Sequence, residues 1–172
     1  MNDRFAHHLR LDQVRDGARL DLSADENERN AIANRFGLLS LKRFEAHACL
    51  TRTGDVVRAQ GRLQAALDQY CSVTGDPVAA HVDEPFALLF SPDPPRGGPD
   101  EEIALGEADC DIVFYDGAVI DLGSAIADTL ALSLDPYPRS AGAEAALKEA
   151  GVLTEEQASP FAVLAKLQKD EA

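Results

Sequence analysis

Two neighbouring segments that alternate apolar and polar residues, 41–51 and 56–70, constrain the fold of this chain most. Even positions are apolar in the first segment, and odd positions are apolar in the second. A period of two is typical of β-strands that bury one face. Gly54-Asp55 between them suits a two-residue hairpin turn, with glycine first as a type II′ turn prefers. The sequence therefore predicts a β-hairpin.

The same turn predicts the register of this hairpin. It pairs Thr53 with Val56, so even positions of the first strand face odd positions of the second. The apolar sets of both strands then lie on one side, and a shift of one residue would separate them. On the polar side the register places His47 opposite Arg62.

A third strand is predicted over residues 78–90, after a turn at Asp76-Pro77. Pro85 indicates an edge position or a bulge, because proline cannot donate to the ladder. Together the three strands predict an antiparallel meander. The apolar side of the third strand carries Val78, Ala80, Val82, Phe86, Leu88 and Phe90.

Residues 4–11 predict a strand, and cap signals predict a helix after it. Ser23 and Glu26 fit the S-x-x-E capping box, which predicts a helix that begins there. Ile32 and Phe36 form its inner face, and Gly37 suits the left-handed position just past a helix end.

A hairpin and a second helix are predicted beyond the loop of residues 91–98. A turn at residues 116–117 joins short strands at 110–115 and 119–120. Asp121 is expected to cap a helix over 122–134, and Asp135-Pro136 to end it. An apolar stripe typical of an amphipathic helix recurs every four residues, at Leu122, Ile126, Leu130 and Leu134.

These elements predict an α+β fold, in which helices cover one face of an antiparallel sheet. Residues 1–140 are expected to form one domain. Residues 141–172 are expected to form a helical C-terminal tail that docks on this domain or extends from it. Within the tail, segments 143–150 and 161–169 have helical patterns.

The net charge of −14 is concentrated in the second part of the chain. Residues 1–70 hold 11 Lys and Arg against 10 Asp and Glu, whereas residues 71–172 hold 5 against 20. Such an acidic chain is repelled by a bare phosphate backbone and attracts basic proteins. An acidic surface also keeps a protein soluble, so the charge leaves both interpretations open.

Composition and motifs argue against a membrane protein, a metalloprotein and most enzymes. No apolar run reaches about 18 residues and the start lacks an apolar signal region, so we expect a cytoplasmic protein. Cys49, Cys71 and Cys110 are too far apart for a disulfide framework or a zinc site, so buried or unreactive thiols are the simpler interpretation. No phosphate-binding glycine motif is present. We therefore expect no catalytic residue, no metal, no cofactor and no small-molecule substrate.

The polar face of the hairpin is one candidate binding surface. It carries Arg43, His47, Arg58 and Arg62, and arginine suits phosphate or carboxylate recognition. It lacks the aromatic side chains on which single-stranded bases stack. A solvated polar face, or a face packed on the protein's own acidic part, are the alternatives.

The segment D-P-Y-P-R at residues 135–139 is the other candidate. Two prolines stiffen it around Tyr137, and Arg139 follows at once. Tyrosine and arginine are enriched at interface hot spots, which favours a protein-binding tip. The alternative is a plain helix end with Tyr137 packed on the core.

Four segments carry a resemblance to a known family. They are V-x-A-Q-G-R-L-Q-A-A-L-D-Q-Y-C-S-V-T (57–74), V-D-E-P-F-A-L-L-F-S-P (82–92), I-D-L-G-S-A-I-A-D-T-L-A-L-S-L-D-P-Y-P-R (120–139) and S-P-F-A-V-L-A-K-L (159–167). In their order and spacing the chain resembles the YceD family, the large ribosomal RNA subunit accumulation proteins, in its alphaproteobacterial form. Many members carry C-x-x-C at the position of Cys71, but Thr74 stands at its second cysteine here, so no metal is carried over.

The resemblance implies a ribosome-biogenesis factor that promotes accumulation, processing or stability of large-subunit (23S) rRNA by binding, not catalysis. The implied partner is this rRNA or a pre-ribosomal particle. Arg43, Arg58 and Arg62 are our candidates for that contact, and Tyr137 and Arg139 for a protein contact. The alternatives are an acidic chaperone-like binder of a basic ribosomal protein without RNA contact, or an enzyme with an unrecognised site.

Overall fold

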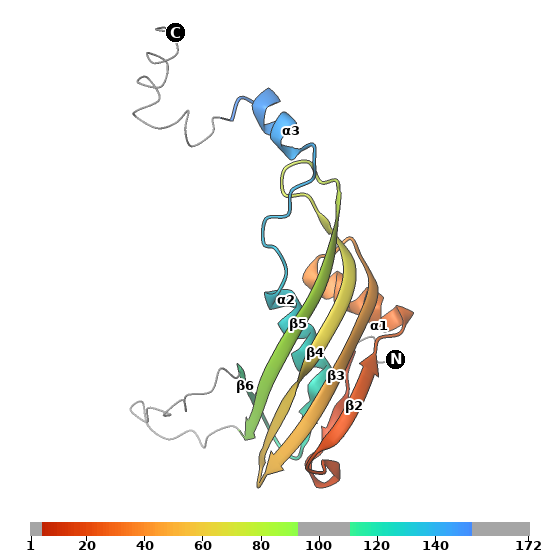
Figure 1. The fold of residues 1–172 in the computed structure, drawn as a ribbon, viewed down its shortest axis with the longest axis vertical. Coiled ribbons are helices and arrows are strands. Elements are labelled where there is room, and N and C mark those ends of the chain that lie inside the picture. The colour runs from red at the N-terminus through yellow and green to blue at the C-terminus, as the bar shows by residue number, and fades with distance from the viewer. Residues whose placement is uncertain (1–4, 93–110, 153–172) are drawn as a thin grey trace, which may run out of the picture. The chain divides into compact units, whose positions relative to one another are not determined.

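The computed structural model describes residues 5–92 and 111–152 (Figure 1). The chain divides into two compact units, which are described separately. The first comprises Met1–Gln69 and Ala79–Pro136, and the second Tyr70–Val78 and Tyr137–Ala172. The part of the chain that the structure describes contains no helix long and apolar enough to span a membrane.

The first unit is built on a five-stranded sheet of order β2-β3-β4-β5-β6. Strands β2 and β3 pair antiparallel, as do β3 and β4, but β6 pairs parallel with β5. The prediction of a purely antiparallel sheet was therefore wrong, and the sheet is mixed. Its strands are β2 (Ala18–Ser23), β3 (Ser40–Thr53), β4 (Val56–Tyr70), β5 (Pro77–Pro92) and β6 (Asp111–Tyr115).

The predicted register of the β3–β4 hairpin is confirmed. Pairing runs from Thr53 opposite Val56 to Arg43 opposite Ala66, and it shifts by one residue between Leu41 and Arg43. Gly54 has φ 62°, and no described residue other than glycine has a positive φ. A positive φ at the first turn position alone is the type II′ geometry, which glycine adopts without strain.

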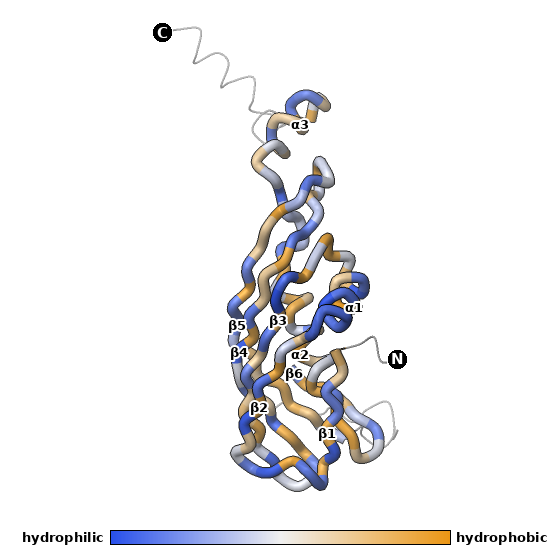
Figure 2. Tube along the Cα trace, turned by 90° about the vertical axis from the view of Figure 1, so that its right-hand side faces the viewer, coloured by the Kyte–Doolittle hydropathy of each residue, from blue (hydrophilic) through white to orange (hydrophobic). Residues whose placement is uncertain are grey.

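The register directs the apolar residues of the strands into one core. Phe44, Leu50, Val57, Leu63 and Phe90 are at most 1% exposed. Figure 2 shows the corresponding alternation of hydrophilic and hydrophobic residues along the strands. These residues belong to the same core cluster as buried residues of helices α1 (Glu26–Phe36) and α2 (Leu122–Leu132). Both helices lie on the same side of the sheet (Figures 1 and 2).

Helix α1 begins later than the capping signal predicts. Ser23 is the last residue of β2, paired with Glu45, so it cannot cap a helix. The N-cap is Asp25, whose carboxylate accepts from Glu28 N at 2.8 Å while the Glu28 carboxylate accepts from Asp25 N at 2.8 Å. Two capping-box signals, Ser23 with Glu26 and Asp25 with Glu28, lie only two residues apart in the sequence. Strand pairing of Ser23 leaves Asp25 as the N-cap. Gly37 ends the helix in the left-handed conformation, as predicted.

The hairpin predicted over residues 110–120 does not form. Strand β6 joins β5, whereas β7 (Val119–Asp121) pairs antiparallel with β1 (His8–Arg10) in a separate two-stranded sheet. A 3-10 turn, η1 (Leu11–Gln13), follows β1. The turn signal at residues 116–117 thus carries the chain from one sheet to the other.

Helix α2 follows β7 directly and matches its predicted start. The Asp121 carboxylate accepts from Ser124 N at 3.0 Å, and Leu122, Ile126 and Leu130 are fully buried. The helix ends at Leu132, three residues before Asp135-Pro136. A side chain at Gly123 would collide with the backbone of residues 5 and 7, so glycine permits close packing of this first turn.

The second unit contains helix α3 (Ala143–Glu149), as predicted for residues 143–150. The Pro138 carbonyl accepts from Ser72 N at 2.8 Å and from Ser72 Oγ at 3.1 Å, which joins the two segments of the unit. The helix predicted over 161–169 lies outside the described residues.

Candidate interaction surfaces

The four candidate residues of the hairpin lie on the face of the sheet opposite the core, here called the outer face. Arg43 and His47 are on β3, and Arg58 and Arg62 are on β4. Side-chain exposure is 55% for Arg43, 70% for His47 and 55% for Arg62. The structure therefore brings these residues to one accessible surface.

Carboxylates from the two neighbouring strands neutralise much of this surface. Arg62 Nε lies 2.5 Å from Asp83 Oδ1 on β5, and His47 Nδ1 lies 2.6 Å from Asp21 Oδ1 on β2. Sequence reasoning missed both acids, because pairing across β2 and β5 was not predicted residue by residue. The hydrogen bond to Arg62 holds the pKa of Asp83 below its usual value, and the same bond raises the pKa of Arg62.

The two remaining candidate arginines, Arg43 and Arg58, differ from each other. Arg43 donates to Gln64 Oε1 at 3.1 Å and lies 3.9 Å from Glu45. Arg58 stands opposite Thr51 in the register and forms no ion pair with another described residue. Of the three candidate arginines on the outer face, Arg58 is therefore the one without an ion-pair partner among the described residues.

The predicted tip belongs to the second unit. Tyr137 is 73% exposed, so its ring is not part of the buried core. Arg139 is exposed, whereas Pro138 between them is buried. Both candidate side chains are thus accessible, and the Ser72–Pro138 hydrogen bonds hold the backbone between them.

The two described cysteines have different environments. Cys49 is exposed on the outer face, whereas Cys71 is buried. Cys71 Sγ accepts hydrogen bonds from Ser140 N at 3.3 Å and from Thr74 N at 3.4 Å. Donation from Ser140, and then from Thr74, lowers the pKa of the Cys71 thiol to about 6. Hydrogen bonds that favour the charged form act in this direction.

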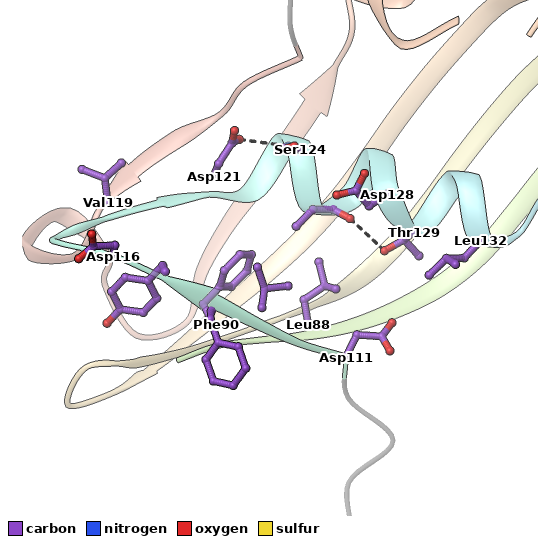
Figure 3. Close-up of a pocket in the computed structure, with 14 residues that line it drawn as sticks. Leu88, Phe90, Asp111, Asp116, Val119, Asp121, Ser124, Asp128, Thr129 and Leu132 are labelled. Atoms are coloured by element: carbon purple, nitrogen blue, oxygen red, sulfur yellow. Dashed lines mark hydrogen bonds between the residues drawn. The ribbon is translucent and has the colours of Figure 1, made fainter. Parts of the chain in front are cut away.

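A groove of about 480 Å³ lies between α2 and the strands β5 and β6 (Figure 3). Buried Leu88 and Phe90 lie between the helix and β6, and exposed Leu132 lies at one end. Asp111 and Asp116 stand at opposite ends of β6. None of the described residues that line it is Lys, Arg or His. The sequence analysis missed this groove, because the parallel pairing of β6 creates it.

The carboxylates of the groove differ in their partners. Asp121 caps α2, and Asp128 lies 2.6 Å from Arg35 Nη2. Asp111 and Asp116 form no ion pair with another described residue. The structure, over its described ranges, shows no group of three or more His, Cys, Asp or Glu side chains that would hold a metal ion.

Comparison with protein-family models found a match over most of the chain. The family model described as "Large ribosomal RNA subunit accumulation protein YceD" matches residues 59–168, which is more than half of the chain. The matched range includes the whole groove, Arg62, Tyr137 and Arg139, whereas Arg43, His47 and Arg58 precede it. Searches of curated proteins and of solved structures found no match. The chain belongs to the YceD family, whose name implies a role in accumulation of large-subunit ribosomal RNA.

Proposed function

We propose that the protein promotes accumulation, processing or stability of large-subunit rRNA by binding to the rRNA or to its pre-ribosomal particle. The family membership carries this proposal, because the family is named for rRNA accumulation and not for a reaction. Action by binding, rather than by catalysis, is part of the proposal.

The outer face is the proposed site of the RNA contact. Arg58 supports it most strongly, because its charge is not compensated by an ion pair with another described residue. Arg43 and Arg62 lie on the same face and would exchange their present partners for phosphate. Because phosphate contacts release counterions, this contact should weaken as salt rises.

Sedimentation on sucrose gradients tests this function. The wild-type protein should travel with pre-large-subunit particles, and the triple substitution Arg43→Gln/Arg58→Gln/Arg62→Gln should shift it to the top of the gradient. Two single substitutions sharpen the test. Arg58→Gln should weaken association, whereas Arg15→Gln removes an exposed cation outside the strands of the sheet and should not. Unchanged sedimentation of the triple variant would refute the RNA contact.

A second candidate is an acidic, chaperone-like binder of a basic ribosomal protein. The net charge of −14 and the carboxylates beside the outer-face cations support this candidate. Treatment of the captured complex with ribonuclease separates the two candidates. Loss of rRNA with a ribosomal protein retained favours the protein binder, and loss of both favours the RNA contact.

A further inference from the structure

The geometry of the α2–β6 groove points to a binding site for a basic segment of another protein that carries large apolar side chains. The site depends on the second candidate above, a basic protein partner, and it specifies where that partner is held. It lies apart from the arginines of the outer face, so each contact can be tested without the other.

Three exposed apolar side chains gather at the rim of the groove. Leu132 is 79% exposed, Phe114 49% and Val119 43%, and all three line the same groove. Beneath them lie Leu88 and Phe90, at 2% and 0% exposure. A gathered apolar patch of this kind is typical of an interaction site, whereas single exposed apolar residues are ordinary.

The negative charge of the groove favours a positively charged partner. Asp111, Asp116, Asp121 and Asp128 line it, and no Lys, Arg or His lines it among the described residues. Arg35 compensates Asp128, but Asp111 and Asp116 remain at the two ends of β6. Lysine or arginine side chains that flank an apolar anchor would meet these two carboxylates. Complementary charges of this kind raise both the specificity and the rate of association.

The chain's own neighbouring segment has the wrong charge for this site. Residues 93–110, which lead into β6, contain six carboxylates and a single cation, Arg96. Their charge has the same sign as the rim of the groove. Residues 161–169 combine apolar residues with Lys166 and Lys169, so they are the competing occupant that an experiment must test.

Fluorescence anisotropy with the full-length protein and synthetic peptides tests the inference. The probe is a labelled peptide of about 12 residues that combines lysine and arginine with leucine and phenylalanine, the composition typical of amphipathic anchors. Two matched peptides replace either its cations by glutamate or its apolar residues by serine. We expect the first peptide to bind about tenfold more tightly than either matched peptide, which is about 1.4 kcal/mol.

Two double variants with the same change in net charge locate the site. Asp111→Asn/Asp116→Asn should weaken binding of the basic apolar peptide about fivefold or more, a difference of about 1 kcal/mol. Glu144→Gln/Glu149→Gln, on α3, should leave the affinity unchanged. Leu132→Ser, at an exposed position, should weaken binding without loss of the folded state, which circular dichroism checks. Equal affinity of the two double variants would overturn the inference.

Other occupants give distinct results in the same assay. If binding of the peptide appears only when Lys166→Glu/Lys169→Glu is introduced, the chain's own C-terminal segment fills the groove and the partner site is refuted. If Asp111→Asn/Asp116→Asn alters binding of a short RNA instead of the peptide, the groove is not a protein site. Gradient sedimentation of the same variant keeps the proposals apart, because peptide binding can fail while association with large-subunit particles persists.

Discussion

The outer face of the sheet and the α2–β6 groove both carry charged side chains, but they differ in how those charges are compensated. On the outer face, strand pairing sets Arg62 beside Asp83 and His47 beside Asp21. In the groove, Asp111 and Asp116 are separated by apolar side chains and lack a cationic neighbour among the lining residues. A partner of the outer face must therefore replace the Asp83 carboxylate at Arg62, whereas a cationic partner of the groove would meet Asp111 and Asp116 directly.

The difference has a structural origin. The outer face belongs to long antiparallel strands, in which opposite residues lie within about 5.5 Å of each other. The groove forms where the short parallel strand β6 ends the sheet and α2 lies beside it. Cross-strand partners are therefore available on the outer face and scarce at the groove.

The largest expected effect is a loss of stability when Phe90, at the floor of the groove, is truncated. Phe90→Ala removes a fully buried side chain that is also part of the core, so it should lower the free energy of unfolding by about 3–5 kcal/mol. Gln60→Ala, on the exposed side of β4, is the control and should change it by less than about 0.5 kcal/mol. Urea denaturation monitors both, and a small effect of Phe90→Ala would mean that the groove is separate from the core.

The Cys71 thiolate differs from both regions, because neutral N–H donors rather than charged groups stabilise it. Its pKa of about 6, against an ordinary 9.0, predicts thiolate absorbance that rises with a midpoint near pH 6 and that is missing in Cys71→Ser. Because the folded pKa is the lower one, its stabilising contribution is complete above about pH 9 and declines as the pH falls towards 6. A midpoint near the ordinary value would show that Ser140 and Thr74 do not hold the thiolate.

Acid titration tests the ion pair between Arg62 and Asp83 on the outer face. The pKa of Asp83 is lowered from 3.8, mainly by its hydrogen bond to Arg62, so its stabilising contribution is present above that pH and is lost as the pH falls further. Melting temperatures recorded between neutral pH and strong acid should therefore fall more in the wild type than in Asp83→Asn. Arg62→Gln should remove the same difference, and identical acid profiles for all three proteins would contradict the pairing.

The smallest effect is expected at Arg58. Arg58→Gln breaks no ion pair with another described residue, so it should alter the free energy of unfolding by less than about 0.5 kcal/mol. Arg62→Gln, which strands Asp83 without its partner, should cost more in the same measurement. A larger loss at Arg58 than at Arg62 would reverse our ranking of the outer-face cations.

Local signals predicted the elements that depend on neighbours in the sequence. The alternation of apolar and polar residues, together with Gly54, was enough to predict the β3–β4 register as far as Arg43. A two-residue turn leaves little freedom in how the strands pair. Asp121 and the apolar stripe were enough for the start and buried face of α2. The four outer-face candidates followed from that register, and the exposure of Arg43, His47 and Arg62 agrees with it.

The sequence by itself thus determined the hairpin, the α2 stripe, the acidic charge and the resemblance to the family. Only the tertiary structure decided that β6 pairs with β5 and β7 with β1, because a short strand carries too little pattern to specify a distant partner. The pairing of β6 with β5 created the groove, and the tertiary structure also placed Asp21 beside His47 and Asp83 beside Arg62 on the outer face. Both outcomes depend on contacts between residues far apart in the chain, which no local pattern encodes.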